Sequence, residues 1–477
     1  MTTHTFVKKE HDKAYIANSL WLPKTGIRTE PVQKALEFTV QTQQGQVMLR
    51  MWDESRSHII CPREFLPHSE YAKFKFPFVD LRPDFEEVDF EDNVTPRDEE
   101  QQRAWDALAL NDNGILNLAC GKGKTILAVK KIAQRRVPTL VVVPDTGIMS
   151  QWEQAISRHL KFDGKVGIIK GKKFEWNNPV VIALVTTLWK RIEEDDCPAE
   201  MFRYFGQVEY DEVHQIGAPK FALTAAPFYG DRLGFTATVE REDGLDPIYR
   251  YHIGDPFYSD LTQQLIPEIF FQQTPAVFDH LSAMRNGATN MSVLRTMMGR
   301  DRVGNIFRYW HIKQALDAGR KIICISHSKD QLRLLHALFP GSGLLVQETK
   351  NRMEVLRNSR VCFAIAKLGS TGIDDDRLDT LFWLTPFSSK IALQQSMGRI
   401  QRILAGKKDP LYVVFEDWLN APLKRIVQSL KHDLKKWGFK YNVVKPNNMP
   451  REFPPDIERL YDAAFKELPT QGETVDE

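Results

Sequence analysis

Short apolar runs recur along most of the chain and alternate with longer stretches in which apolar residues return every three or four positions. The first pattern predicts buried strands and the second predicts helices, so their alternation indicates mainly parallel sheets covered on both faces. In the first half the expected strands are Ile115–Ala119, Thr139–Pro144, Val180–Thr186, Gln207–Asp211 and Leu233–Thr238. In the second half they are Lys321–Ser326, Gly343–Gln347, Val361–Ala366, Thr380–Thr385 and Leu411–Phe415. We therefore predict two successive α/β lobes of similar size.

The segments on either side of these lobes have different patterns. Ala35–Thr42 and Val47–Trp52 predict two strands joined by a turn, within a small N-terminal α+β domain. The acidic stretch Asp80–Asn93 predicts a linker. The last residues are acidic and rich in proline, which predicts a tail with one short helix around Asp456–Leu468. The predicted domains are residues 1–93 (accessory, a candidate DNA-binding domain), 94–245 (lobe one), 246–445 (lobe two) and 446–477 (tail).

Composition limits the classes of protein that remain. The chain has 477 residues and 42% hydrophobic content, enough for two or three cores. Its formal net charge is only +2, so binding to a polyanion would need local basic patches. The five cysteines show no CxxC spacing, which disfavours a zinc site or a disulfide framework and favours a reducing interior. The polar N-terminus and the lack of an apolar run of about 18 residues predict a cytoplasmic protein without a membrane segment.

The strongest local signal is the motif GKGKT, which follows a predicted strand and opens a predicted helix. Backbone N–H groups of such a turn and of the helix N-terminus can surround a phosphate. Lys124 would reach the β- and γ-phosphates of ATP, and Thr125 would place its hydroxyl on Mg²⁺. Leu118 stands where the strict motif has glycine, and an ordinary lysine-rich turn is the alternative. The expected nucleotide-binding residues are Gly121, Lys122, Gly123, Lys124 and Thr125.

Two adjacent acids, Asp211 and Glu212, follow another predicted strand. Ligands gather at the carboxyl ends of parallel strands, where these acids are expected. Asp211 could hold Mg²⁺, and Glu212 could orient and deprotonate the attacking water. A solvated acidic loop is the alternative. His214 could couple the nucleotide site to the next motif or satisfy a hydrogen bond in the core.

These motifs together resemble a known set. GKGKT, then DEVH at 211–214, TAT at 236–238 and QSMGRIQR at 395–402 appear in the order seen in superfamily 2 helicases. The resemblance covers residues 94–420 and implies two RecA-like lobes that hydrolyse ATP with Mg²⁺. It implies that Gln395 senses the γ-phosphate or positions water. It also implies that Arg399 and Arg402 stabilise the transferring phosphoryl group from lobe two, with a surface ion pair as the alternative.

The resemblance assigns further residues. Arg97 and Gln101 resemble the pair on the adenine side, with Gln102 as the alternative because the spacing is one residue longer than usual. Gly372 and Asp374 resemble the lobe-two motif that links ATP to the nucleic-acid track. Contacts with the nucleic-acid backbone are implied for Pro144, Gln151, Trp152, Thr186, Thr187 and Thr371.

Residues 234–244, GFTATVEREDG, resemble the XPB-like branch of the superfamily, which includes phage UvsW-type branch-migration helicases. Val239 and the pair Asp375–Asp376 depart from the usual pattern. The resemblance implies a monomeric motor that remodels duplex or branched DNA in recombination, replication or repair, with single-stranded DNA as a further candidate partner. If the protein is phage-encoded, the host cytoplasm is its expected location. An RNA helicase and the motor subunit of a larger restriction or repair complex are the alternatives.

Two flanking features stay open. Apolar residues at helical spacing between Leu423 and Trp437 predict a helix, and its lysines form either a DNA-binding face or a solvated one. The N-terminal hairpin could recognise a DNA branch point or serve as a packing module.

Overall fold

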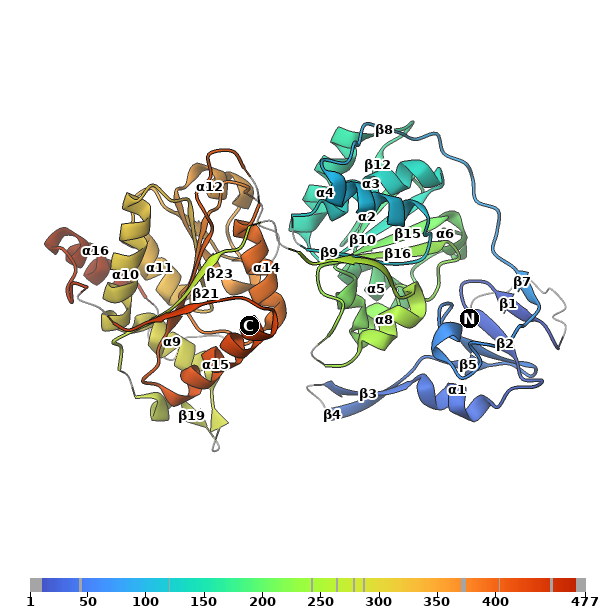
Figure 1. The fold of residues 1–477 in the computed structure, drawn as a ribbon, viewed down its shortest axis with the longest axis horizontal. Coiled ribbons are helices and arrows are strands. Elements are labelled where there is room, and N and C mark those ends of the chain that lie inside the picture. Colours follow the sequence, from blue (N-terminus) through green and yellow to red (C-terminus); the bar gives the residue numbers. More distant parts are fainter. Residues whose placement is uncertain are drawn as a thin grey trace. The chain divides into compact units, whose positions relative to one another are not determined.

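The computed structural model describes residues 11–42, 45–119, 121–241, 243–262, 265–277, 279–285, 288–369, 375–402, 404–446 and 449–468. The chain divides into two compact units, residues 1–262 and 263–477 (Figure 1). Each unit contains a large, mainly parallel sheet, so the predicted pair of α/β lobes is confirmed. No helix in the described ranges is both long enough and apolar enough to cross a membrane.

The first unit begins with a small α+β module. Its sheet has the order β5-β6-β2-β1-β7, with β1 (Ala14–Ile16), β2 (Leu20–Pro23), β5 (Asp53–Glu54), β6 (His58–Cys61) and β7 (Phe78–Asp80). A separate hairpin consists of β3 (Glu37–Thr42) and β4 (Gly45–Arg50), near the two strands expected from the sequence. The helices of this module are α1 (Thr29–Ala35) and the short 3-10 helix η1 (Leu66–His68). The hairpin packs Phe38, Val40 and Leu49 against Leu245 and Ile248.

The main sheet of the first unit has the order β13-β12-β14-β10-β15-β16-β9-β17. Its strands are β9 (Gly114–Leu118), β10 (Thr139–Val143), β12 (Val166–Lys170), β13 (Lys173–Phe174), β14 (Val180–Leu184), β15 (Gln207–Asp211), β16 (Asp231–Thr236) and β17 (Pro256–Asp260). Neighbours pair in parallel except β12 with β13. Every residue of β9, β10 and β14 is buried, which is why these runs are mostly apolar, with Asn117 and Thr139 as the polar positions.

Helices cover both faces of this sheet. They are α2 (Glu99–Ala109), α3 (Lys124–Arg135), α4 (Thr146–His159), α5 (Val185–Glu193), α6 (Ala199–Tyr204), η2 (Val213–Gly217), α7 (Pro219–Ala222) and α8 (Asp246–Ile253). Part of the predicted acidic linker is ordered, because β8 (Glu91–Asp92) pairs with β11 (Leu160–Lys161).

The first lobe extends further along the chain than predicted. β17 pairs in parallel with β9, and α8 buries Ile248, Tyr249 and Ile253. Residues 246–262 therefore belong to the first unit, and the predicted boundary at 245/246 moves to 262/263. The sequence of β17, PFYSD, shows no run of aliphatic residues and pairs with a register irregularity, so its pattern did not indicate a strand.

The sheet of the second unit is entirely parallel and has the order β22-β23-β21-β24-β25-β18-β26. Its strands are β18 (Glu268–Gln273), β21 (Ile322–Ser326), β22 (Gly343–Leu345), β23 (Val361–Ile365), β24 (Thr380–Trp383), β25 (Leu411–Glu416) and β26 (Asn442–Val444). Its helices are α9 (Met291–Arg300), α10 (Arg302–Asp317), α11 (Lys329–Ala337), α12 (Arg352–Asn358), α13 (Ala366–Gly369), α14 (Lys390–Ile400), α15 (Ala421–Lys436) and α16 (Pro455–Lys466). The short 3-10 helix η3 (His280–Ala283) precedes a small hairpin of β19 (Met284–Arg285) and β20 (Ala288–Thr289).

The segment predicted as a tail is part of the second lobe as far as Leu468. Phe453, Ile457 and Tyr461 are buried in the same cluster as the strands and helices of the lobe. The expected helix near 456–468 is confirmed as α16, but it packs against α11 instead of extending into solvent. An amphipathic sequence predicts a helix but does not indicate which core its apolar side covers, so the sequence alone did not place α16 on the second lobe.

Candidate nucleotide site and nucleic-acid contacts

Five neighbouring strands of the first unit present their carboxyl ends along one edge of the sheet. Their order is β14-β10-β15-β16-β9, and all of them run in parallel. The phosphate-loop motif follows β9, Asp211 ends β15 and Thr236 ends β16. The chemistry-bearing residues that the sequence singled out in this unit therefore come together at one edge, where ligands of parallel sheets bind.

The phosphate loop has the backbone shape that its glycines allow. Gly121 and Gly123 have φ values of 82° and 81°, in the left-handed region that glycine enters at little cost. A Cβ at position 123 would lie 2.1 Å from Nε2 of Gln101, so a side chain cannot be added without a shift. Gly123 is the N-cap of α3, and as it has no side chain, it leaves the first N–H groups of this 12-residue helix available to an anion.

The two polar side chains at the start of α3 are positioned for phosphate chemistry. The ammonium of Lys124 donates to the carbonyl oxygen of Leu118 at 3.0 Å, inside the loop. Thr125 lies in the first turn of α3 and is half-buried. A phosphate could take the ammonium from a single backbone carbonyl, because the phosphate carries negative charge and the carbonyl oxygen is neutral.

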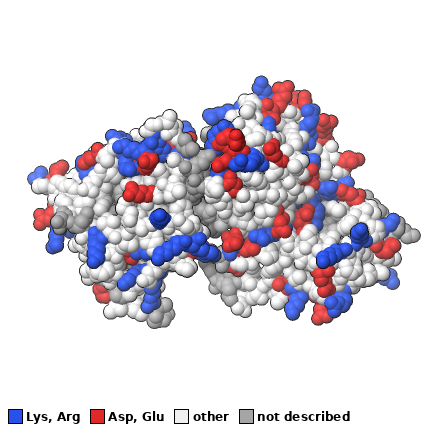
Figure 2. All heavy atoms as spheres, viewed as in Figure 1, with Lys and Arg blue, Asp and Glu red and all other residues white. Residues whose placement is uncertain are grey.

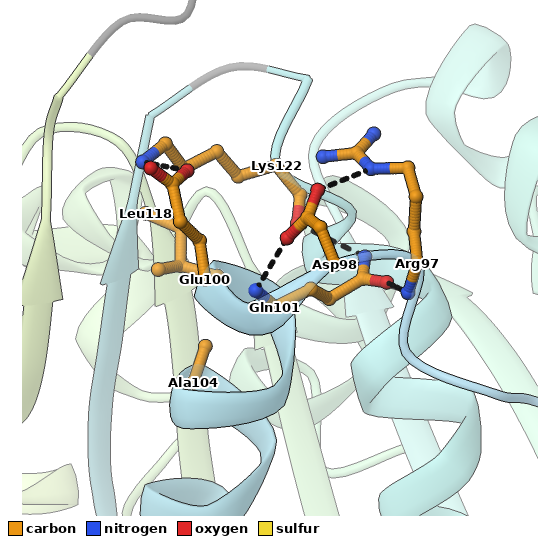
Figure 3. A pocket seen from close by; sticks show the side chains of 7 residues that line it. All are labelled: Arg97, Asp98, Glu100, Gln101, Ala104, Leu118 and Lys122. Atoms are coloured by element: carbon orange, nitrogen blue, oxygen red, sulfur yellow. Dashed lines mark hydrogen bonds and ion pairs between the residues drawn. The ribbon is translucent and has the colours of Figure 1, made fainter.

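Gln101 connects the segment before α2 to the phosphate loop (Figure 3). Its side-chain oxygen accepts from the backbone N–H of Arg97 at 2.7 Å, and its amide donates to the carbonyl oxygen of Lys122 at 3.2 Å. Gln101 is buried, whereas Gln102 is exposed and bonds to Asp106. The geometry thus favours Gln101 over Gln102 as the residue beside the loop. Arg97 and Gln101 line one side of a small pocket there, with Leu118 and Lys122 opposite.

The side chain of Lys122 contacts polar groups of the first unit. Its ammonium lies 2.6 Å from Oδ2 of Asp260, 3.1 Å from Oε2 of Glu100 and 2.7 Å from Oγ1 of Thr262. Its backbone N–H donates to Ala119 at 3.3 Å. In these contacts the ammonium is engaged within the protein, and the nucleotide-binding role expected for Lys122 stays a prediction. Lys122 ties the phosphate loop to α2 and to the last residues of the first unit.

Asp211 accepts two hydrogen bonds at the end of β15. The backbone N–H of Glu212 donates to Oδ1 at 2.9 Å, and the indole N–H of Trp152 donates to Oδ2 at 2.8 Å. Burial, followed by the charge of Glu212, raises the pKa of Asp211 to about 6. A half-buried carboxylate with lone pairs remaining on both oxygens is suited to a cation, which would replace the lost water.

Glu212 and His214 join this strand end to the next one. Glu212 has φ 50° and ψ 52°, a left-handed conformation that costs a non-glycine residue about 1 kcal/mol or more. Oγ1 of Thr236 lies 3.0 Å from Nδ1 of His214 and 3.4 Å from Oε2 of Glu212. Burial and the nearby cations Arg241 and Lys124 lower the pKa of His214 to about 4, so its ring is neutral at pH 7. The hydrogen bond joins the DEVH and TAT motifs, and it fits both alternatives, coupling between the motifs and a satisfied hydrogen bond in the core.

Four of the predicted nucleic-acid contacts lie after β10 and β14 with partly or fully exposed side chains or at the strand ends. Pro144 directly follows β10, and Thr186 is exposed in the first turn of α5, so both lie along the same sheet edge as the phosphate loop. Gln151 is half-buried, and the hydroxyl of Thr187 accepts from the backbone of Gly171 at 3.1 Å.

Trp152 is the exception among these contacts. Its side chain is 0% exposed within the core cluster of the first unit, so the predicted contact of Trp152 with nucleic acid is corrected. The sequence missed its bond to Asp211 because no local pattern indicates a partner so far along the chain. Thr371, Gly372 and Asp374 lie outside the described residues.

In the second unit, α14 carries the remaining predicted residues. Leu393, Met397 and Ile400 are buried in the core, which leaves Gln395 and Arg399 half-buried on another side of the helix. Arg402 follows the helix and forms an ion pair of 2.8 Å with Asp376. This is the surface pair that the sequence left as an alternative. Its partners are 29% and 58% exposed, and such a pair is worth about 0–1 kcal/mol. The expectation that Arg399 and Arg402 complete the nucleotide site stays a prediction.

The arrangement of Asp211 and Thr125 fits Mg²⁺ better than a metal held by protein alone. Among the described residues, no group of three or more His, Cys, Asp or Glu side chains is arranged to hold an ion. Magnesium usually takes one or two protein oxygens and fills its shell with water and nucleotide phosphates. A single half-buried carboxylate beside a phosphate loop provides that kind of partial site.

Comparisons with known proteins agree with this geometry. Residues 93–241 match the family model described as the res subunit of type III restriction enzymes. A DNA 3'-5' translocase, XPB2 of Sulfurisphaera tokodaii, is 30% identical over 210 residues, which cover 41% of this chain and 46% of that protein. A protein of Acanthamoeba polyphaga mimivirus, whose name proposes an ATP-dependent RNA helicase, is 26% identical over 70% of this chain and 65% of its own length. The matches thus span less than two thirds of both relatives.

Solved structures and the XPB proteins complete the comparison. Saccharomyces cerevisiae Dbp5 bound to RNA and ADP BeF3 aligns with a TM-score of 0.50 at 14% identity, covering 77% of this chain and 93% of that one. This likeness shows the two-lobed fold. The DNA 3'-5' helicase XPB of Mycobacterium tuberculosis is 33% identical over 149 residues, which cover 31% of this chain and 27% of that protein. With the motifs at one sheet edge and these relatives, the chain is similar to superfamily 2 helicases of the XPB-like branch.

Proposed function

We propose that the protein hydrolyses ATP to move along DNA and remodel branched DNA structures. One observation carries the ATPase part: a loop with two left-handed glycines, the free N-terminus of α3 and the acids Asp211 and Glu212 share one edge of the sheet. A helix N-terminus binds phosphate, and the acids beside it can activate water.

The proposed roles follow from the contacts of each side chain. Lys124 exchanges its bond to Leu118 for the β- and γ-phosphates, while Gln101 keeps the loop in register with α2. Glu212 takes a proton from the attacking water. Bound Mg²⁺ would neutralise phosphate charge, held by Asp211 and the hydroxyl of Thr125. Arg399 and Arg402 would stabilise the transition state, and Gln395 would position water or sense the γ-phosphate.

Contacts with the track would come from the same edge of the sheet. Pro144, Gln151, Thr186 and Thr187 follow β10 and β14, which lie beside the strands that carry the nucleotide residues. Because both sets of residues follow strands of one sheet, a shift of the nucleotide phosphates would be transmitted to the residues that contact the nucleic acid. Such contacts address the backbone and carry no base information, so binding would be independent of sequence.

A basic surface on the second unit supports binding to a polyanion. Lys and Arg side chains form a band over α15 (Figure 2). On this helix Lys424, Arg425, Lys435 and Lys436 are exposed, while Leu423, Val427, Leu430 and Leu434 fill the core. Since the net charge is only +2, local bands of this kind would supply most of the attraction to nucleic acid.

The choice of DNA rests on the relatives of the XPB-like branch, which are named as DNA helicases and translocases. Branch migration breaks about as many base pairs as it forms, so the motor needs little net work per step. The competing candidate is an RNA helicase, favoured by the mimivirus relative that matches 70% of the chain.

One set of ATPase measurements tests both parts of the proposal. We expect forked and four-way DNA to stimulate hydrolysis well above RNA, and Lys124→Ala to abolish the stimulated rate. Lys190→Ala is the matched control, since Lys190 is exposed on α5 and pairs only weakly with Glu194. Full activity of Lys124→Ala would refute the assignment of the phosphate loop. Stimulation by RNA alone would refute the DNA-remodelling function.

A further inference from the structure

The N-terminal module exposes a row of phenylalanines that no part of the proposed motor uses. Phe74, Phe76 and Phe78 occupy alternate positions in the sequence YAKFKFPF, and Lys73 and Lys75 stand on either side of Phe74. Phe74 is 51% exposed and Phe78 is 44% exposed, and both lysines are exposed. We call these five residues the aromatic strip. Large apolar side chains normally lie in the interior, so a contiguous exposed set indicates a binding surface.

The three rings form one continuous surface. Phe74 and Phe76 are stacked with centroids 5.9 Å apart and an interplanar angle of 24°. Phe76 and Phe78 meet edge to face at 6.3 Å. Alternate residues of an extended chain point to the same side, which explains why the rings follow one another while Lys73 and Lys75 occupy the alternate positions around Phe74.

The strip is held at both ends. Tyr71 is buried beneath the ring of Phe74, and its hydroxyl donates to the carbonyl oxygen of Arg28. At the other end Phe78 begins β7, which pairs in parallel with β1 at the edge of the small sheet (Figure 1). The rings are therefore presented by a fixed backbone, which lowers the entropy lost when a ligand binds.

The lysines of the strip have their charges available. Neither Lys73 nor Lys75 forms an ion pair with any residue that the structure describes. An exposed aromatic row with unpaired ammonium groups at its side combines an apolar face with a positive border. This is the chemistry of proteins that stack bases on aromatic rings and hold the phosphates with lysines.

We propose that the aromatic strip binds unpaired nucleotides of a single strand, by stacking bases on Phe74 and Phe78 and pairing phosphates with Lys73 and Lys75. Duplex regions are excluded, because their bases are already stacked on one another. No group of the strip is placed to read base edges, so the binding is independent of sequence. The inference deepens the proposed function by giving the N-terminal module a partner, the unpaired strand at a junction. It requires no ATP.

The test measures affinity of the full chain for labelled oligothymidylate, without nucleotide, by fluorescence anisotropy. We expect the double variant Phe74→Ala, Phe78→Ala to bind the single strand at least about thirtyfold more weakly, since each of the two lost stacks costs about fivefold or more. Affinity for blunt duplex should change little. The matched control is Phe465→Ala, a phenylalanine of similar exposure (42%) on α16. Unchanged single-strand affinity in the double variant would overturn the proposal.

Two further variants separate stacking from other causes. Replacement of Phe74 and Phe78 by Trp should preserve affinity and replacement by Leu should not, because only an aromatic ring stacks. Lys73→Gln with Lys75→Gln should lower the slope of log affinity against log salt by about 1.4, two phosphates at 0.7 each for a single strand. Equal losses of duplex and single-strand affinity, or binding of anionic lipid vesicles in place of the strand, would contradict the proposal.

The outcome is distinguishable from that of the proposed function. The binding assay contains no ATP and leaves the phosphate loop untouched, so Lys124→Ala should retain full single-strand affinity at the strip. If the strip fails while branched DNA still stimulates hydrolysis, only the inference falls. If hydrolysis fails while the strip binds, the motor function falls and the strip stands.

Discussion

The bond between Trp152 and Asp211 gives the sharpest test of the nucleotide site. Trp152→Phe keeps an aromatic side chain in the core and removes only the outer ring and the indole N–H, which donates to Oδ2 at 2.8 Å. A hydrogen bond to a charged acceptor is worth about 1.5–3 kcal/mol. If that bond orients Asp211 for Mg²⁺, its loss lowers hydrolysis by about ten- to 150-fold at a fixed Mg²⁺ concentration.

The assay is a Mg²⁺ titration of DNA-stimulated ATP hydrolysis, with Mn²⁺ binding followed by electron paramagnetic resonance as a readout independent of turnover. We expect the variant to need more Mg²⁺ and to bind Mn²⁺ with ADP more weakly. Trp310→Phe is the control, because its indole also donates one hydrogen bond, to the carbonyl of Glu452 in the second unit. It should leave the Mg²⁺ dependence unchanged.

One result would refute this reasoning. Trp152→Phe would have to fold, as judged by circular dichroism and an unfolding midpoint near that of Trp310→Phe, and still show wild-type Mg²⁺ dependence. Asp211 would then be oriented by the Glu212 N–H alone, and Trp152 would be only a core residue.

Two further predictions concern Glu212 and the buried His252 of the first unit. Glu212→Gln should keep nucleotide affinity and lose about 10²–10⁴-fold in single-turnover hydrolysis, since only the proton acceptor is removed; a normal rate would assign the base elsewhere. Burial, then Arg232 and Arg63, lowers the pKa of His252 to about 3, so the folded state keeps it neutral while the unfolded chain protonates near pH 6.5. The corresponding stability is present above pH 6.5 and is lost as the pH falls towards 3, amounting to about 2 kcal/mol between pH 7 and 5. Urea unfolding of His252→Gln should show a pH dependence smaller by that amount, and an unchanged dependence would show that His252 does not carry it.

The phosphate loop and the strands around it could be predicted because their signals are local. A continuous apolar run such as β14 indicates a buried strand, and Gly121 and Gly123 shortly after β9 indicate a turn that other residues adopt poorly. The helix α15 was predicted for a similar reason, because its buried residues recur at the helical period.

The contacts that the sequence did not indicate join distant parts of the chain. Trp152 was placed on the nucleic acid by its position in a motif, whereas the sheet order puts its indole against Asp211, 59 positions away. β17 joins the first sheet through pairing with β9, which the sequence of β17 alone does not indicate. Lys122 belongs to the loop motif, yet Asp260 and Glu100 determine where its charge goes. Such partners become visible only when the topology is known.

The position of Lys122 has a mechanical consequence. Asp260 and Thr262, which its ammonium holds, are among the last residues before the chain leaves the first unit. Tension on the chain at Thr262 is therefore transmitted to the cradle of the nucleotide through one side chain, besides the backbone pairing of β17 with β9. Because linkage is reciprocal, the two effects have the same free energy. If breaking the contacts of Lys122 with Asp260 and Thr262 changes the affinity for nucleotide, binding of nucleotide changes the stability of those contacts by the same amount.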